Sequence, residues 1–385
     1  MWCIHMPRKN NGTSDDKRPQ DESSEKATIS RRRYITATGS LGIAGLAGVG
    51  TAGALVSKKR VPKYYSGGEV IHWMYVPQAW YEHVQQAKRA LEQLNQAAFE
   101  QSSVLETGLV RSEDQQYGGW NGFKIEPVIE TGKTVRLPSS INGIDISVET
   151  RDADAVTPDT DGCYNIGDFS PYPGGVNVYD VSGQDIPCTS GYPVDSGSGK
   201  LDIVVAAHCF GDCNVTIGDD AFKETESLGN IDYGDANADI AVIELDSGKY
   251  VDKAVREPDG TMRTVKGCAS ESEIERRASD AFDGHTKIGC TTGETVGGIG
   301  KAHISRSSCP SLKGEGFRSE HDAAGGDSGG PHYSIENGDA FMLGHHWGSG
   351  NVKDSAYCHK ELDVKNTSYG MSCYWLENNS TYVVP

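Results

Sequence analysis

Hydrophobic residues recur with helical spacing in one long stretch of the chain. Residues 78–106 are rich in Ala, Gln, Glu and Leu, and their apolar positions return every three or four residues. Such spacing predicts an amphipathic α-helix with one buried face. The residues expected on that face are Val84, Ala87, Leu91, Leu94 and Ala98.

After this helix the apolar runs become short. Residues 122–150 combine β-branched side chains, alternating polarity and turn-forming Gly, Pro and Asn, which predicts a few short strands. Residues 152–175 are acidic and rich in Pro and Gly, unlike a core element. They are expected to form a linker, where a domain boundary falls naturally.

From Val176 to the C-terminus, short apolar runs are separated by Gly, Asp, Asn and Ser. Examples are LDIVVAA at 201–207, DIAVIEL at 239–245, FMLGHHW at 341–347 and TYVVP at 381–385. Helical periodicity is scarce in this part of the chain. Many short strands with frequent turns predict an all-β sandwich or barrel.

The first 54 residues are expected to be an export signal. The run SRRRYI at 30–35 precedes an uncharged, glycine-rich stretch that reaches Ser57, and together they resemble a twin-arginine signal. Small residues at 52–54 suit cleavage by signal peptidase. An uncleaved membrane anchor is the alternative, but six glycines make the stretch only weakly apolar for a stable span. The protein is therefore expected to be secreted, or held at the cell surface if uncleaved, with membrane contact only during export.

The chain has 385 residues and a formal net charge of −18. The length leaves room for two domains, or for one domain with extensions. Because phosphate binding requires clustered Lys and Arg, no nucleic-acid partner is expected. The strong acidity suits high salt, where ions screen self-repulsion, although an ordinary acidic secreted protein is equally compatible with it.

Ten cysteines in an exported chain predict disulfides. Removing the signal with Cys3 leaves nine, an odd number. A second cleavage between Cys163 and Cys188 would leave eight, which could all pair, whereas a free thiol explains the odd number equally well. The sequence contains neither a C-x-x-C pair nor an H-E-x-x-H run, so no metal and no cofactor is expected.

The stretch HDAAGGDSGGPHY at 321–333 surrounds Ser328 with glycines. In a chain with 47 glycines this could be only a tight turn. If Ser328 is a nucleophile, it requires a histidine base and a carboxylate that orients the base. His208 follows the apolar run at 201–207 and is the candidate base.

The candidate carboxylate is Asp239, which directly precedes an apolar run. Burying it unpaired would be costly, and a histidine N–H is a suitable partner. Asp232 and Asp235 are the alternatives, but they lie in a looser and more polar stretch.

Three motifs occur in the order AAHC, DIAVIEL and GDSGGP, and this order resembles the chymotrypsin-like serine peptidases. The resemblance covers about residues 174–355. The short spacing of 31 residues between His208 and Asp239, and the motif CTSGYPV at 188–194, are similar to the bacterial secreted streptogrisin and α-lytic branch. The resemblance implies two antiparallel β-barrels with the site between them.

The resemblance also implies several roles around the nucleophile. Backbone N–H groups of Gly326 and Ser328 would form the oxyanion hole. Asp327 would be buried and paired with a cation, and an internal arginine is expected rather than a freed amino terminus. Cys188 and Cys209 would form a disulfide that clamps the hairpin carrying the histidine.

For substrate binding, the resemblance implies that His346, Trp347 and Gly348 pair with an extended peptide backbone. Asp322 precedes Ser328 by six residues, where trypsin-like members have an acidic pocket base. This would give cleavage after Lys or Arg. However, Ala324 stands where those relatives have a cysteine, and a surface Asp322 is the alternative.

These expectations combine into one hypothesis. Residues 1–54 are the signal region, 55–165 an α+β pro-segment or accessory region, and 166–385 the peptidase domain, with cleavage between about 163 and 176. The protein is expected to be a monomeric, secreted serine endopeptidase that acts on proteins or peptides through an acyl-enzyme. The alternatives are a catalytically inactive binding or scaffold protein, and an α/β-hydrolase esterase suggested by G-x-S-x-G. In an α/β-hydrolase the catalytic Asp and His follow the serine along the chain, but only 57 residues follow Ser328.

Overall fold

The structure is a computed structural model. It describes residues 57–98, 103–152, 164–180, 188–211, 215–223, 225–280, 282–306, 312–357 and 360–385. The signal region lies outside these ranges and remains a prediction. Within them, no helix is long and apolar enough to cross a membrane.

The first described part of the chain forms a hairpin, one long helix and several strands. In order they are β1 (Lys58–Ser66), β2 (Glu69–Pro77), α1 (Gln78–Ala98), β3 (Val104–Tyr117), β4 (Trp120–Ile125), β5 (Val128–Glu130), β6 (Ser140–Ile141), β7 (Ile144–Asp145) and β8 (Glu149–Arg151). The predicted helix is present, and all five residues of its expected apolar face are buried. Its predicted end at residue 106 is wrong, because residues 104–106 begin β3.

The next part carries the candidate histidine and aspartate. Its elements are β9 (Tyr172–Gly174), β10 (Asn177–Val178), β11 (Cys188–Thr189), β12 (Pro193–Asp195), β13 (Leu201–Ala206), the 3₁₀-helix η2 (Ala207–Phe210), β14 (Asp220–Lys223), β15 (Glu226–Asp235), β16 (Ile240–Leu245) and β17 (Val251–Arg256). Five of these strands form an antiparallel sheet in the order β12-β13-β16-β15-β14. This sheet has its own hydrophobic core, which includes alternate residues of β13 and β16: Ile203, Val205, Ala241 and Ile243.

The last part carries the candidate serine. Its elements are β18 (Met262–Ala269), α2 (Glu271–Ser279), β19 (Gly284–Gly289), β20 (Gly293–Arg306), β21 (Leu312–Ser319), β22 (Pro331–Glu336), β23 (Asp339–Tyr357), β24 (Lys360–Ser372) and α3 (Cys373–Asn379). Antiparallel pairings run β19-β20-β21-β24-β23-β22 and return to β19, which closes a six-stranded barrel. The predicted all-β, chymotrypsin-like fold class is confirmed. Of the two expected barrels, the described residues close one, and the other is a five-stranded sheet with β12 and β14 at its edges.

Three local expectations are wrong. The end of the predicted linker is core, because Tyr172 is buried and β9 pairs with β17 in parallel. The helices α2 and α3 were not expected in the C-terminal part. The run 381–385 is not a strand, since it makes only one isolated bridge, between Val383 and Asp195.

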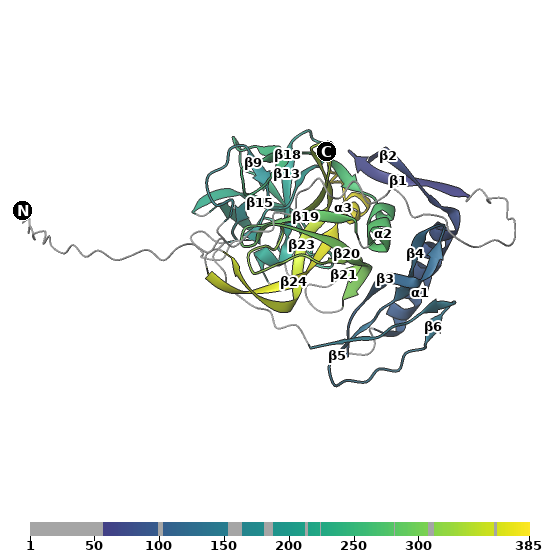
Figure 1. Cartoon of the computed structure of the whole chain (residues 1–385). Helices are drawn as coiled ribbons and strands as arrows, with labels where there is room; N and C mark the ends of the chain where they lie inside the picture. The colour runs from purple at the N-terminus through teal and green to yellow at the C-terminus, as the bar shows by residue number, and fades with distance from the viewer. Residues whose placement is uncertain are drawn as a thin grey trace, which may run out of the picture. The chain divides into compact units, whose positions relative to one another are not determined.

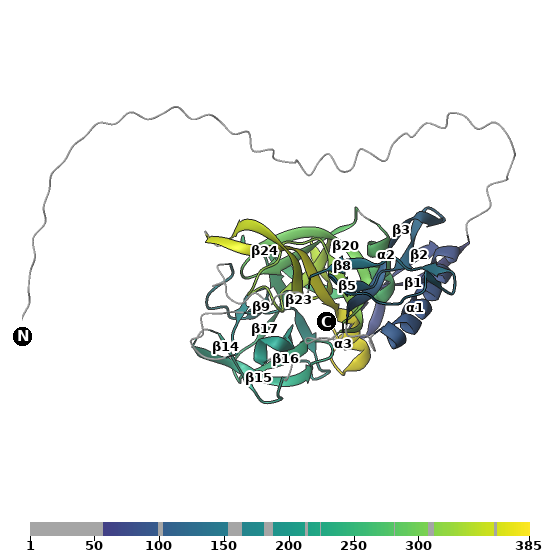
Figure 2. The same cartoon turned by 90° about the horizontal axis from the view of Figure 1, so that it is seen from below.

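The part spanning β1 to β8 is joined to the barrel. Strand β1 pairs with β18, and β3 pairs with β20, so one sheet continues from one part into the other. Figures 1 and 2 both show α1, β1 and β2 on one side of the folded part, away from β15. The candidate catalytic histidine and aspartate adjoin β13 and β16 of the five-stranded sheet.

Two disulfides are present among the described cysteines. Cys188 bonds to Cys209, the pair that the resemblance implied, and Cys268 bonds to Cys373. Cys290 is buried and free, so full pairing of the eight cysteines does not occur here. Cys3, Cys163, Cys213, Cys309 and Cys358 lie outside the described residues.

Candidate active site

The histidine is held at the end of a buried strand. The side chains of Val205, Ala206 and Ala207 are fully buried, and their small or branched shape lets β13 pack closely before the chain turns into η2. The disulfide to Cys209 anchors this turn from the next position. The side chain of His208 itself is 26% exposed, so it remains open to a substrate.

Asp239 orients that histidine. Its side chain is 1% exposed, and its Oδ2 lies 2.7 Å from His208 Nδ1. Its Oδ1 accepts the backbone N–H of His208 at 2.8 Å. A carboxylate that accepts both bonds fixes the ring and selects the tautomer with a proton on Nδ1. Asp239 is held with φ of 50°, and its carbonyl accepts the Ala207 N–H.

The two alternative aspartates are engaged elsewhere. Asp232 accepts a hydrogen bond from the Tyr382 hydroxyl. Asp235 accepts the backbone N–H of Asn237 at the turn before β16. Neither interaction involves His208.

Ser328 completes the arrangement. Its Oγ lies 2.8 Å from His208 Nε2, the nitrogen that has its lone pair free when Nδ1 is protonated. The serine lies in the loop between β21 and β22, 120 residues after the histidine. The structure therefore brings the three predicted side chains together.

The glycines around Ser328 meet strict steric limits. Gly329 has φ of +88°, and a Cβ on it would lie 2.2 Å from the Thr189 carbonyl oxygen. Thr189 in turn donates its backbone N–H to the Ser328 carbonyl at 2.7 Å. The backbone N–H groups of Gly326 and Ser328 donate no hydrogen bond within the described part of the chain, so they remain available to an oxyanion.

The cation paired with Asp327 is Lys287, and the expectation of an arginine is wrong. Lys287 Nζ lies 2.7 Å from Asp327 Oδ2, and both side chains are fully buried. Asp327 also accepts backbone N–H bonds from Ala324, Thr291 and Thr292, and the hydroxyl of Thr292. These bonds satisfy the carboxylate and hold the loop that carries the nucleophile.

Among the predicted substrate residues, His346 is hydrogen-bonded directly to this loop. The His346 carbonyl accepts the Gly329 N–H, and its own N–H donates to Gly330, each at 2.7 Å. The Trp347 side chain is buried against Tyr369, whereas a Cβ on Gly348 would meet open space. Asp322 is half-buried beside His321.

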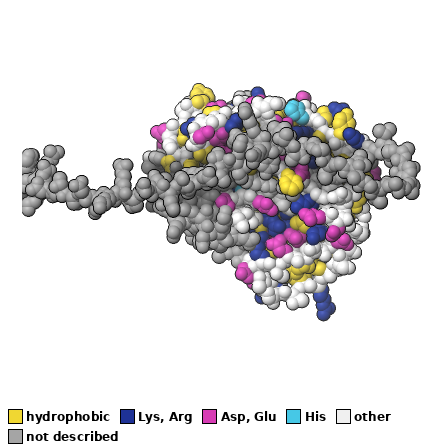
Figure 3. Space-filling model, viewed as in Figure 1, with side chains coloured by type: hydrophobic (Ala, Val, Ile, Leu, Met, Phe, Trp, Pro, Cys, Tyr) yellow, Lys and Arg dark blue, Asp and Glu magenta, His cyan; other side chains and the backbone are white. Residues whose placement is uncertain are grey.

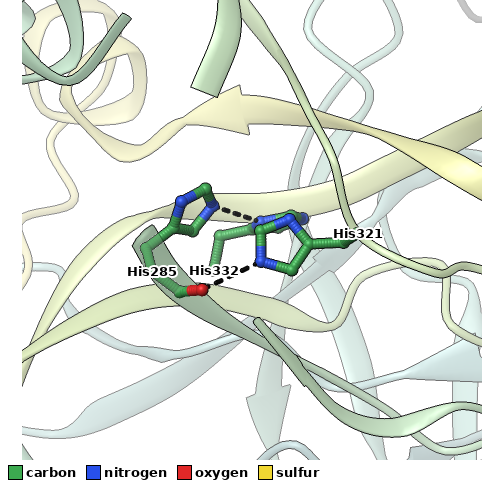
Figure 4. Close-up of side chains that lie close together, drawn as sticks. All are labelled: His285, His321 and His332. Carbon is green, nitrogen blue, oxygen red and sulfur yellow. Dashed lines mark hydrogen bonds between the residues drawn. The ribbon is translucent and has the colours of Figure 1, made fainter. Parts of the chain in front are cut away.

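Sequence reasoning missed a row of buried side chains behind the loop. His346 Nδ1 lies 2.7 Å from Ser368 Oγ, Ser368 Oγ lies 3.2 Å from His332 Nε2, and His332 Nδ1 lies 3.0 Å from His285 Nε2. We call these four residues the histidine row. Figure 4 shows the inner end of the row, where the His321 ring also donates to the His285 carbonyl. Burial, and then nearby histidine, lysine and arginine charges, lower the pKa of His285, His332 and His346 well below the ordinary value.

Two groups of described side chains have donor atoms close enough to hold a metal ion. They are His285, His321 and His332, and Glu271, Glu275 and His303. Each histidine of the first group already makes a hydrogen bond within the protein, and Lys88 forms ion pairs with both carboxylates of the second. The expectation of no metal is not tested by this arrangement.

A closed antiparallel barrel and a second antiparallel sheet, with a Ser-His-Asp arrangement between them, are consistent with the chymotrypsin-like fold. No family model matches the chain, and no curated protein matches it either.

Several solved structures are similar to the chain. Thermobifida fusca Protease A is 21% identical, with a TM-score of 0.39, and the match covers 54% of this chain and 94% of that one. Nocardiopsis Protease is 21% identical, with a TM-score of 0.39, covering 55% and 97%. A glutamic acid specific serine protease that utilizes a histidine triad in substrate binding is 19% identical, with a TM-score of 0.42, covering 55% and 99%.

Proposed function

We propose that the protein is a secreted serine endopeptidase that cleaves peptide bonds through an acyl-enzyme intermediate. The observation that carries this proposal is that His208 bridges Asp239 and Ser328 at 2.7 and 2.8 Å. The all-β fold of the described residues excludes the α/β-hydrolase esterase, which requires alternating strands and helices. The two disulfides support an oxidising, extracellular location.

The chemistry follows from the three side chains. As Ser328 Oγ attacks the scissile carbonyl carbon, its proton passes to His208 Nε2, and the carbonyl oxygen becomes an oxyanion. The protonated His208, stabilised by the Asp239 carboxylate, then gives that proton to the leaving amine, and the peptide bond breaks. Water attacks the resulting Ser328 ester by the same steps, which releases the acid and restores the hydroxyl.

Backbone donors supply much of the stabilisation in this scheme. The N–H groups of Gly326 and Ser328 are expected to bind the oxyanion, and each such donor contributes about 3–4 kcal/mol in comparable sites. Their orientation depends on the buried Lys287–Asp327 pair, which fixes the loop between them. The site thus combines a nucleophile with a preorganised anion site.

The activity is tested by incubating the folded, processed protein with a peptide library. The wild type is expected to cleave internal peptide bonds, whereas Ser328→Ala should lose nearly all activity. Ser227→Ala, which alters an exposed serine on β15, is the matched control and should keep full activity. A wild type that folds but cleaves nothing would favour the inactive scaffold instead.

For the residue on the acyl side of the cleaved bond, we infer a preference for acidic side chains. The histidine row ends at His346, next to the loop of Ser328. Because the pKa values of its histidines are lowered, the rings are neutral at pH 7, and the row holds its protons in one of two orders. At the inner end, His285 Nδ1 is buried and has no partner among the described residues.

The unpartnered nitrogen favours one proton order. A buried N–H without an acceptor is costlier than a buried lone pair without a donor, so His285 Nδ1 is expected to be unprotonated. His285 then donates to His332, His332 to Ser368, and Ser368 to His346 Nδ1. This order leaves a proton on His346 Nε2, and an N–H donor at that point suits a carboxylate.

The competing interpretation is the acidic pocket base at Asp322, which predicts cleavage after Lys or Arg. Fluorogenic peptides that differ only in Glu, Lys or Phe at this position separate the two. We expect Glu to be preferred, and His346→Phe to lower kcat/KM for Glu roughly 10- to 100-fold by removing a charge-assisted hydrogen bond. His72→Phe, at an exposed histidine of β2, should change nothing.

The outcomes are distinct. A preference for Lys that Asp322→Ser abolishes would establish the Asp322 pocket and refute the role of the histidine row. A preference for Glu that EDTA abolishes would assign carboxylate binding to a metal ion on His285, His321 and His332 instead.

A further inference from the structure

Residues 58–151, which we call the N-terminal segment, share a sheet and a core with the barrel. Strand β3 pairs with β20 through Val110 and Lys301, and β1 pairs with β18 through Tyr64 and Ala269. Residues of both parts lie in one continuous hydrophobic core. The Tyr64 ring is fully buried and stacks on Phe341 of β23 at 4.2 Å between centroids.

A buried charge of the barrel depends entirely on this segment. The Lys301 side chain is fully buried, and its Nζ lies 2.9 Å from both Glu106 Oε1 and Glu126 Oε1. Its other contacts, the Glu149 carboxylate and the Glu126 carbonyl, also come from the segment. Without the segment, Lys301 would lose every carboxylate that it contacts among the described residues.

Other ion pairs cross the same junction. Arg318 of β21 contacts Glu149 at 3.0 Å and Glu126 at 3.5 Å. In the opposite direction, Arg151 of the segment donates a hydrogen bond to the Tyr369 hydroxyl of β24, and Glu106 of the same segment holds its guanidinium at 3.1 Å. Figure 3 shows acidic and basic side chains intermixed on the face where Figure 1 labels β3, β20 and β21.

Polar contacts also join α1 and β4 of the segment to α2. Lys88 of α1 forms an ion pair with Glu271 of α2 and lies 3.4 Å from Glu275, whose side chain is 1% exposed. Asn121 of β4 donates its side-chain amide to the Ser279 carbonyl at the end of α2. The segment therefore contacts α2, β18, β20, β21 and β24, at both its sheet and its helix.

We propose that the N-terminal segment is a permanent part of the mature protein, and that it stays bound as a separate chain after the linker is cut. A segment that is released after folding must leave a surface that water can solvate. Release of this one would break the buried ion pairs of Lys301 and expose an apolar core to water, and both changes oppose release. The proposal does not depend on the peptidase activity.

The electrostatic part of the attachment has a defined pH dependence. Burial alone raises the pKa of Glu106, but Lys301, Arg151 and Arg318 outweigh it and lower the pKa from 4.5 to about 2. A lowered pKa in the bound state strengthens binding above pH 4.5 and loses that contribution as the pH falls toward 2. Only the part of this shift that Lys301 and Arg318 cause favours the bound state, because Arg151 belongs to the segment itself.

The test uses the full chain with Ser328→Ala, so that no self-cleavage occurs. A recognition sequence for a site-specific protease is inserted between residues 153 and 163, and the cut protein is examined by size exclusion and intact mass. We expect both chains in one peak at pH 7.5, also in 1 M NaCl, because buried pairs are weakly screened. Elution of the segment apart from the rest, folded or not, would overturn the proposal.

Two further measurements test the role of Glu106. Acidifying the cut protein toward pH 3 should weaken the complex by at least about tenfold. At pH 7.5, Glu106→Gln should weaken it similarly, whereas Glu113→Gln, on the same strand with an 80% exposed side chain, should not. Equal dissociation constants for the two variants, with no effect of acid on the unsubstituted complex, would refute the role of the buried charges.

Discussion

Replacing Lys287 with Met tests the buried ion pair behind the nucleophile. The methionine side chain is similar in length to lysine and apolar, so the fully enclosed space remains filled while the charge is removed. Asp327 keeps three backbone N–H bonds and the Thr292 hydroxyl, but it loses its only ion-pair partner among the described residues.

The expected cost follows from that geometry. Removing one partner of a buried pair costs roughly 3–5 kcal/mol, because the other charge stays buried without compensation. Since four hydrogen bonds remain on Asp327, we expect the lower end of this range, about 3 kcal/mol in the free energy of unfolding. The nucleophile loop should also lose its fixed position, and kcat/KM should fall by more than about tenfold.

The assay is urea unfolding followed by tryptophan fluorescence, with peptide hydrolysis measured in parallel. Lys200→Met is the control, because that lysine is 41% exposed and its ion pair with Glu244 lies at the surface. This control should cost less than about 1 kcal/mol and leave activity unchanged. If Lys287→Met unfolds at the same urea concentration as the wild type, the reasoning about the buried pair is refuted.

Three more predictions concern the same folded part. Gly329→Ala should abolish peptide hydrolysis and lower the free energy of unfolding, because its Cβ would lie 2.2 Å from the Thr189 carbonyl oxygen. Gly284→Ala is the control: its Cβ has room, so it should change peptide hydrolysis and urea unfolding only mildly. Replacing both Cys188 and Cys209 with Ala should lower the free energy of unfolding by about 3 kcal/mol, measured by urea unfolding, since the bond closes a loop with a separation of 21 residues; an unchanged unfolding midpoint would contradict this. Burial raises the pKa of Glu377 from 4.5 to about 7, so the folded state loses stability as the pH rises from 4.5 through 7. Glu377→Gln should therefore add about 3 kcal/mol to the free energy of unfolding at pH 8 and nothing at pH 4. An equal effect at both pH values would refute this reasoning.

The sequence predicted those features whose signal is local. Hydrophobic spacing located α1 and its buried face, because one helix face repeats every three or four residues. The three motif positions also came from local context, since His208 and Asp239 each adjoin a buried strand and Ser328 lies among glycines. A signal for α2 was present and missed: Ser270 accepts the N–H of Glu273, which is the start of a capping box.

Features that depend on strand pairing could not be predicted in this way. Lys287 faces Asp327 only because β19 runs beside the nucleophile loop, 40 residues away in sequence. The histidine row combines side chains from β19, β22, β23 and β24, whose register around the barrel no local pattern specifies. The burial of Tyr172 likewise follows from parallel pairing with Val251, far along the chain.

Labelling with a fluorophosphonate tests the central claim most directly, because the reagent reacts with an activated serine hydroxyl. In the folded and processed protein, mass spectrometry is expected to locate one adduct on Ser328. The adduct should be absent in Ser328→Ala and strongly reduced in His208→Ala, which retains the serine without its base. A folded wild type that acquires no adduct at Ser328, or reacts equally well without His208, would contradict the account.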